Sequence, residues 1–164
     1  MCTGVKMTEG SDSVLFFDFE TTGEKDKITD IGALLGPAEY HGTSLDKFRE
    51  VLSGAEYICG HNIIAHDIPL LKSIAEVPEI NAKIPVDTLL LSPLLFSKKP
   101  YHRLVKDYKK SDLKLFRNNP LLDSRLCREL LADEMAAFDS LDNDTKKLYW
   151  NLLKDIDGYK GFFK

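Results

Sequence analysis

Two acidic residues interrupt an otherwise apolar segment near the start of the chain. Residues 14–19 read VLFFDF and are closed by ETTG, a pattern that predicts a buried strand ending in a turn. Asp18 and Glu20 are two residues apart, so the strand period directs both carboxylates to one side of the sheet. An isolated pair of this kind is compatible with simple solvation. Flanking phenylalanines instead put the charges at the edge of a core, which favours a site for Mg²⁺ or Mn²⁺.

Strand and helix patterns alternate along the rest of the chain. Apolar runs closed by turn residues predict further strands at 28–36, 57–62 and 84–88. Helical spacing predicts helices from Ser44 to Gly54, from His66 onward, and at 89–96, 120–138 and 146–153. The polar segment 97–119 is expected to be a partly mobile surface segment with a short helix around 101–108. This order predicts an α/β fold around a mixed sheet.

Length and apolar content suit one main domain. The chain has 164 residues, of which 43% are hydrophobic, enough to supply a sizeable core. We expect a flexible N-terminus at 1–12, the main domain at 13–140, and a C-terminal helix and tail at 141–164. Because the chain ends on the apolar sequence GYKGFFK, we expect the native polypeptide to continue, with a further domain after the tail.

The overall charge argues mildly against a nucleic-acid partner. The formal net charge is −4, whereas nucleic-acid-binding domains usually carry a basic footprint. Bound cations would neutralise clustered carboxylates, and a local basic strip is still able to hold phosphates. Such a strip is formed by Lys98, Lys99, His102, Arg103, Lys106, Lys109 and Lys110.

The cysteines and the hydropathy pattern indicate a cytoplasmic protein without a membrane partner. Cys2, Cys59 and Cys127 are odd in number and match neither a zinc site nor a disulfide framework. The polar N-terminus lacks the apolar stretch of a signal peptide, and no segment approaches the ~20 apolar residues that span a bilayer.

Three segments together resemble the motifs of DnaQ-like (DEDD) 3′→5′ exonucleases. The first is VLFFDFETTG followed by ITDIGAL, the second is ICGHNIIAHDIPLL at 58–71, and the third is NNPLLDSRLCRELL at 118–131. They occur in the family's order over residues 14–131. The resemblance implies a ribonuclease H-like fold, in which helices flank a mixed five-stranded sheet, with residues 13–140 as the exonuclease domain.

The resemblance also implies a set of metal ligands. Asp18 and Glu20 would bind two Mg²⁺ or Mn²⁺ ions together with Asp67 of the second motif and Asp123 of the third. One metal would activate the attacking water and the other would stabilise the leaving 3′ oxygen. Asp87, between the second and third motifs, is assigned to structure.

The general base is the position at which this sequence departs from the family. The histidine subclass has its base five residues before the last Asp, and the tyrosine subclass four residues before it; these positions are Asn118 and Asn119 here. An asparagine amide does not accept a proton at neutral pH. His102, in the polar segment before the third motif, is the candidate base, and His66 is the alternative.

The predicted activity is removal of nucleoside 5′-monophosphates from the single-stranded 3′ end of DNA or RNA. The nucleic-acid contacts are expected from Phe19, Thr21, Thr22, His61, Asn62 and Lys106. A catalytically weak nucleic-acid-binding module of the same fold is the alternative, motivated by the missing base. The segment YHRLVKDYKK with NNPLLDS also resembles exonuclease domains fused ahead of RecQ-type helicases, which implies DNA repair and a helicase domain in the same polypeptide. A stand-alone trimming enzyme fits the same residues.

Overall fold

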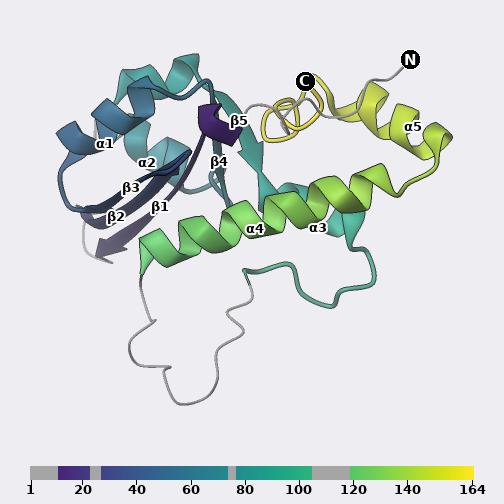
Figure 1. The fold of residues 1–164 in the computed structure, drawn as a ribbon, viewed down its shortest axis with the longest axis horizontal. Helices are drawn as coiled ribbons and strands as arrows, with labels where there is room; N and C mark the ends of the chain where they lie inside the picture. The colour runs from purple at the N-terminus through teal and green to yellow at the C-terminus, as the bar shows by residue number, and fades with distance from the viewer. Residues whose placement is uncertain (1–10, 23–26, 74–76, 105–118) are drawn as a thin grey trace.

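A five-stranded sheet with the order β3-β2-β1-β4-β5 organises the computed structural model (Figure 1). The structure describes residues 11–22, 27–73, 77–104 and 119–164. The strands are β1 (Val14–Thr22), β2 (Lys27–Leu35), β3 (Ala38–Gly42), β4 (Tyr57–Gly60) and β5 (Ile84–Asp87). The first three are antiparallel, whereas β4 and β5 continue the sheet in parallel. The expected α/β class with a mixed five-stranded sheet is therefore confirmed.

The helices cover both faces of this sheet. They are α1 (Leu45–Ser53), α2 (Asp67–Ser73), α3 (Thr88–Leu95), α4 (Pro120–Asp139) and α5 (Asn143–Leu153), with short 3₁₀ turns η2 (Ser11–Ser13) and η3 (Pro78–Ala82). None of the described helices combines the length and the hydropathy needed to cross a membrane.

The side-chain alternation of β1 divides the core into two layers. Leu15, Phe17 and Phe19 point to the face covered by α1 and α2, where Phe17 and Phe19 contact the ring of Phe48 edge to face. Val14 and Phe16 point to the face covered by α3 and α4. Asp18 and Glu20 have the same parity as Phe16, so they lie on the α4 side.

β1 is paired with β2 over more of its length than with β4. β2 accompanies β1 along its whole length, with a register shift between Glu20 and Thr21. The pairs with β4 involve only the stretch from Val14 to Phe16. The acidic part of β1 therefore extends past the end of β4. The register shift leaves Thr29 of β2 without an opposite residue on β1, directly beside the pair of Glu20 and Asp30.

The first turn of α4 rests directly on β2 at Gly32. A methyl group at Gly32 would overlap the backbone of Pro120 and Leu121, so the close approach requires glycine. Asn119 caps the helix through its side-chain oxygen, which accepts from the Leu122 nitrogen (3.1 Å). The Ser124 hydroxyl, fully buried, lies 3.1 Å from the Gly32 carbonyl oxygen.

The C-terminal tail packs against its own domain. Phe162 and Phe163 are buried and contact the ring of Phe138 on α4 edge to face. Gly158 forms a parallel bridge with Val86 of β5, and the Trp150 indole donates to the Phe163 carbonyl oxygen (3.2 Å). The two phenylalanines of the C-terminal sequence GYKGFFK therefore belong to the hydrophobic core beside α4.

Two local expectations differ from the structure. β3 was not predicted, because its residues are mostly exposed and carry no apolar alternation after the Gly36-Pro37 turn. Residues 101–104 are not helical, although a short helix was expected from 101 to 108. The rest of that segment, up to residue 118, lies outside the described residues.

Gly32→Ala tests the contact between α4 and β2. We expect it to lower the free energy of unfolding by about 2–3 kcal/mol, because backbone atoms of the facing helix cannot move aside as a flexible side chain does. Urea denaturation measures the change. Gly54→Ala is the matched control: Gly54 has α-helical dihedral angles, and a methyl group there would meet the end of the Leu35 side chain closely and the Val51 carbonyl oxygen at an ordinary contact distance, so a change within about 1 kcal/mol is expected. Equal effects of both substitutions would contradict this account.

Candidate metal centre

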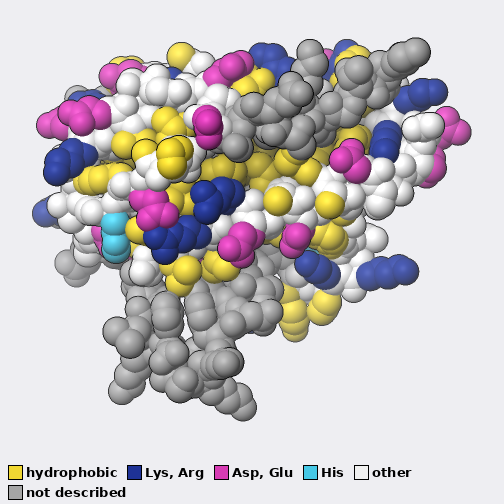
Figure 2. All heavy atoms as spheres, in the orientation of Figure 1, with side chains coloured by type: hydrophobic (Ala, Val, Ile, Leu, Met, Phe, Trp, Pro, Cys, Tyr) yellow, Lys and Arg dark blue, Asp and Glu magenta, His cyan; other side chains and the backbone are white. Residues whose placement is uncertain are grey.

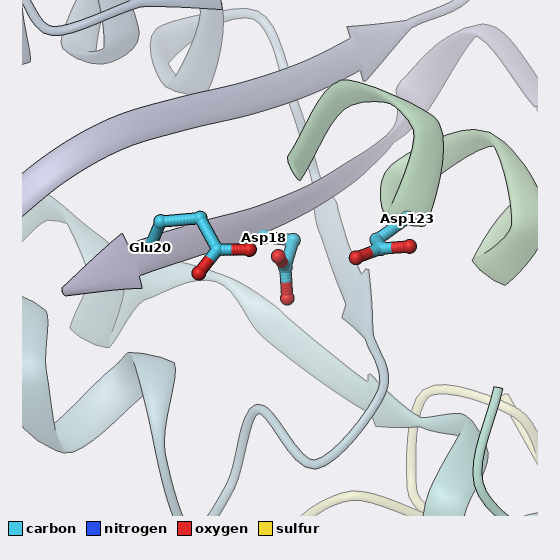
Figure 3. A group of neighbouring side chains, drawn as sticks. All are labelled: Asp18, Glu20 and Asp123. Atoms are coloured by element: carbon cyan, nitrogen blue, oxygen red, sulfur yellow. The ribbon is translucent and has the colours of Figure 1, made fainter. Parts of the chain in front are cut away.

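Three carboxylates from two distant segments converge beside the first turn of α4. Asp18 and Glu20 come from β1, and Asp123 comes from α4 (Figure 3). One carboxylate oxygen of each lies within 4.8 Å of the others. Asp18 and Glu20 are half-buried. The strand parity of β1 and the anchoring of α4 on Gly32 together create this cluster.

The donor set of this cluster fits a hard divalent cation. Carboxylate oxygens are the ligands that Mg²⁺ and Mn²⁺ prefer, and these ions are usually bound by a few protein carboxylates with water completing the shell. Three like charges so close together also repel one another unless a cation neutralises them. The position of Asp123 in the first helical turn adds a favourable helix-dipole interaction with its negative charge.

Asp67, the fourth predicted ligand, is not part of the group brought within 4.8 Å. It begins α2 and is 2% exposed, and this burial raises the pKa of its carboxyl group. Interactions with the His66 ring, whose Nδ1 lies 3.6 Å from Asp67 Oδ1, and with the Phe19 backbone oppose the rise. The Asp67 carboxyl group therefore lies near the backbone of Phe19, the residue between Asp18 and Glu20.

A buried network orders the turn after β4. Asp87 caps α3 by accepting from the Leu89 nitrogen (3.0 Å), and it also accepts from the backbone nitrogens of Asn62 (2.8 Å) and Ile64 (3.1 Å). Asn62 has a positive φ of 77°, a conformation that asparagine tolerates better than most residues. The structural assignment of Asp87 agrees with these bonds.

His61 connects this network to the carboxylate cluster. Its Nδ1 lies 2.9 Å from the Thr88 hydroxyl on α3. Burial lowers the pKa of His61, while Asp87, the backbone of His102 and Asp123 act in the opposite direction. The ring therefore lies between the turn after β4, the segment carrying His102 and the surroundings of Asp123.

The residues predicted as general base or as nucleic-acid contacts differ in their exposure and in their position relative to the carboxylates. His102 is half-buried, whereas the side chain of His66 is 54% exposed and lies beside Asp67. Thr21 and Thr22 end β1 next to Glu20. Phe19 is corrected to a core residue: it is 4% exposed and packs on the face opposite the acids. Asn118 and Lys106 lie outside the described residues, as do Lys109 and Lys110 of the basic strip.

Charge is mixed on the face of the molecule that α4 crosses (Figure 1, Figure 2). Acidic and basic side chains of the described residues are interspersed over the face shown in Figure 2. Asn119 is one of the two positions at which the family has its general base. In this structure its side-chain oxygen accepts from the Leu122 nitrogen and caps α4. A nucleic acid bound here would depend on local cations and metal ions, because the net charge of −4 gives no long-range attraction.

Comparison with protein-family models, with curated proteins and with solved structures found no match to this chain.

Glu134 is a buried ionisable residue that the sequence reasoning missed. It is fully buried on α4, its Oε1 accepts from the Ser92 hydroxyl (2.7 Å), and its Oε2 has no hydrogen-bond partner among the described residues. Burial raises its pKa from 4.5 to about 8. The helical spacing of the sequence indicates this burial, because Glu134 follows Cys127 and Leu131 on the same side of α4.

Glu134→Gln tests this burial through the pH dependence of stability. Wild-type Glu134 binds a proton more tightly when folded, so its contribution to stability is lost as pH rises from about 4.5 to 8. We expect the variant to resemble wild type near the lower pH and to be more stable by on the order of 2–4 kcal/mol near pH 8. Urea denaturation across this range measures it.

Glu129→Gln is the control on the same helix, because Glu129 is exposed. It should leave the pH dependence of unfolding unchanged. A Glu134→Gln variant whose stability follows the wild-type curve at every pH would show that the carboxyl group ionises without cost.

Proposed function

We propose that this chain is a metal-dependent 3′→5′ exonuclease domain of ribonuclease H-like fold, which releases nucleoside 5′-monophosphates from the 3′ end of DNA or RNA. The observation that carries the proposal is the convergence of Asp18, Glu20 and Asp123, three of the four acids that the motif resemblance singles out. Asp123 lies about a hundred residues after Asp18 and Glu20 in the sequence, and the motif resemblance, which uses the sequence alone, named all three.

The sheet supports the same proposal. Its order β3-β2-β1-β4-β5, with β2 antiparallel to β1 and the last two strands parallel to it, suits the expected ribonuclease H-like arrangement. Asp18 and Glu20 lie on the central strand, and Asp123 lies on the helix from the C-terminal half of the chain that packs against this strand. A cluster of negative charge in this position offers no advantage to a module that only binds nucleic acid.

Asp18, Glu20 and Asp123 would hold two divalent cations, with Asp67 contributing from the start of α2. Bound cations would supply charge neutralisation at the phosphate and a more acidic attacking water. The water oxygen forms a bond to phosphorus while the bond from phosphorus to the 3′ oxygen breaks, in line with the attack. The products are a nucleoside 5′-monophosphate and a strand one nucleotide shorter.

His102 is the proposed acceptor of the proton from the attacking water, with His66 as the alternative. The backbone of His102 and the carboxylate of Asp123 both act to raise the pKa of His61, against the larger effect of burial, which supports a position of His102 near the cluster. Thr21, Thr22, His61 and Asn62 are proposed to contact the terminal nucleotide, and the lysines after α3 its neighbouring phosphates.

Hydrolysis of a 5′-labelled single strand tests the proposal. Wild-type protein with Mn²⁺ or Mg²⁺ should shorten the DNA, or a matching RNA, into a ladder from the 3′ end. Asp123→Asn removes one ligand charge without changing the side-chain size, so we expect a rate loss of at least about 100-fold. His102→Ala should lower the rate by about 100-fold or more, as expected for loss of a general base.

Asp139→Asn is the control for the metal-ligand variant, because Asp139 lies at the exposed C-terminal end of the same helix. It should retain the wild-type rate. A ladder that survives His102→Ala but is lost in His66→Ala would assign the base to His66. The absence of a ladder with either metal, in a protein that still binds the strand, would favour the catalytically weak binding module.

A further inference from the structure

A cavity of about 440 Å³ opens beside α4, the helix that carries Asp123. Its walls come from α3, from the segment after α3 and from one side of α4. The lining residues that matter here are Lys99, Tyr101, His102, Arg103, Leu126 and Leu130. A volume of this size falls in the range of small-molecule and nucleotide sites.

The cavity lies on the side of α4 that also carries Asp123. Leu126 and Leu130 follow Asp123 by three and seven residues, a spacing that keeps them on one side of a helix. At 1.5 Å per residue, the part of α4 from Leu126 to Asp133 lies about 5–15 Å along the axis from Asp123. A nucleic-acid strand advances about 3.4 Å per nucleotide when stacked, so this span corresponds to one to a few nucleotides.

The lining of this cavity combines an aromatic and a cationic side chain with apolar ones. The Tyr101 side chain is 70% exposed, and the Arg103 guanidinium lies 5.8 Å from the centre of its ring. Aromatic rings and guanidinium planes are the surfaces on which unpaired bases stack. Leu126 and Leu130 of α4 add apolar side chains to the same lining.

The acidic residues of the lining decide between a base and a phosphate. Glu129 and Asp133 offset the charge of Lys99 and Arg103, so the cavity does not present the concentrated positive charge that a phosphate group requires. Ser92 is a buried residue of the lining, and its hydroxyl donates a hydrogen bond to the buried Glu134. A neutral heterocycle with polar edges and two flat faces suits this mixture.

We propose that this cavity is a subsite for a nucleobase of the substrate strand, one to a few nucleotides on the 5′ side of the scissile bond. The inference rests on the proposed function, since it takes the carboxylate cluster as the position of the scissile phosphate. It assigns Tyr101 and Arg103 to stacking and the two leucines to apolar contact with the base. Single-stranded nucleic acid is the ligand class.

Binding of a single strand with one base removed tests this subsite. The probe is a 5′-fluorescein-labelled oligothymidylate of about 12 nucleotides, in which an abasic tetrahydrofuran residue replaces one nucleotide at a time, counted from the 3′ end. Anisotropy titrations with Ca²⁺ measure affinity, and gel analysis shows whether the strand stays intact. Every abasic probe keeps all its phosphates, so a change in affinity reports the base alone.

In the wild type, loss of the base at one position near the 3′ end should weaken binding by about 5- to 100-fold, the contribution of one stacked base. Tyr101→Ala should bind the intact strand more weakly and lose this position dependence. Leu130→Trp, which fills the cavity from α4, should have the same effect. Leu152→Ala is the control, because Leu152 is 61% exposed on α5, outside the cavity lining, and should leave the profile unchanged.

A flat abasic profile in the wild type, or an unchanged profile in both cavity variants, would overturn the inference. The failure of the proposed function would look different. A protein that shows the position dependence but never shortens the strand with Mn²⁺ keeps the subsite and loses the exonuclease. A protein that shortens the strand with a flat profile keeps the exonuclease and loses the subsite.

Discussion

The contact of the first turn of α4 with Gly32 brings the candidate metal centre together. β1 supplies two acids on one face by its alternation alone, but the third acid comes from about a hundred residues later in the sequence. It reaches them because Gly32 has no side chain and because Ser124 is hydrogen-bonded to the Gly32 carbonyl oxygen. Arg125, just after this first turn, forms an ion pair with Glu39 and so links α4 to β3, the strand next to β2.

Two buried carboxyl groups on this side of the sheet show how differently such groups are accommodated. Asp87 accepts from three backbone nitrogens and so stabilises the turn after β4 and the start of α3. Glu134 has one hydroxyl partner and a raised pKa of about 8, and it lies behind the wall of the cavity. The first arrangement supports the framework of the site, whereas the second leaves a neutral carboxylic acid next to a space that a ligand can enter.

Much of this arrangement could be predicted from local patterns. The alternation of VLFFDFE gave the strand and the common side of Asp18 and Glu20, and the third-motif resemblance selected Asp123 from many surface acids. β3 was missed because an exposed edge strand has little apolar signal. The core position of Phe19 follows from the alternation of β1, which directs Phe19 to one face and the two acids to the other. The cavity beside α4 could not be predicted, because it depends on the path of residues 97–104, which no periodicity specifies.

The crystal structure of the protein soaked with Mn²⁺ tests the central claim most directly, because the anomalous scattering of manganese locates the ion without reference to any activity. The account predicts anomalous density between the carboxylates of Asp18, Glu20 and Asp123, absent in Asp123→Asn. Manganese bound only elsewhere, or a carboxylate cluster that stays free of metal at concentrations supporting hydrolysis, would contradict it.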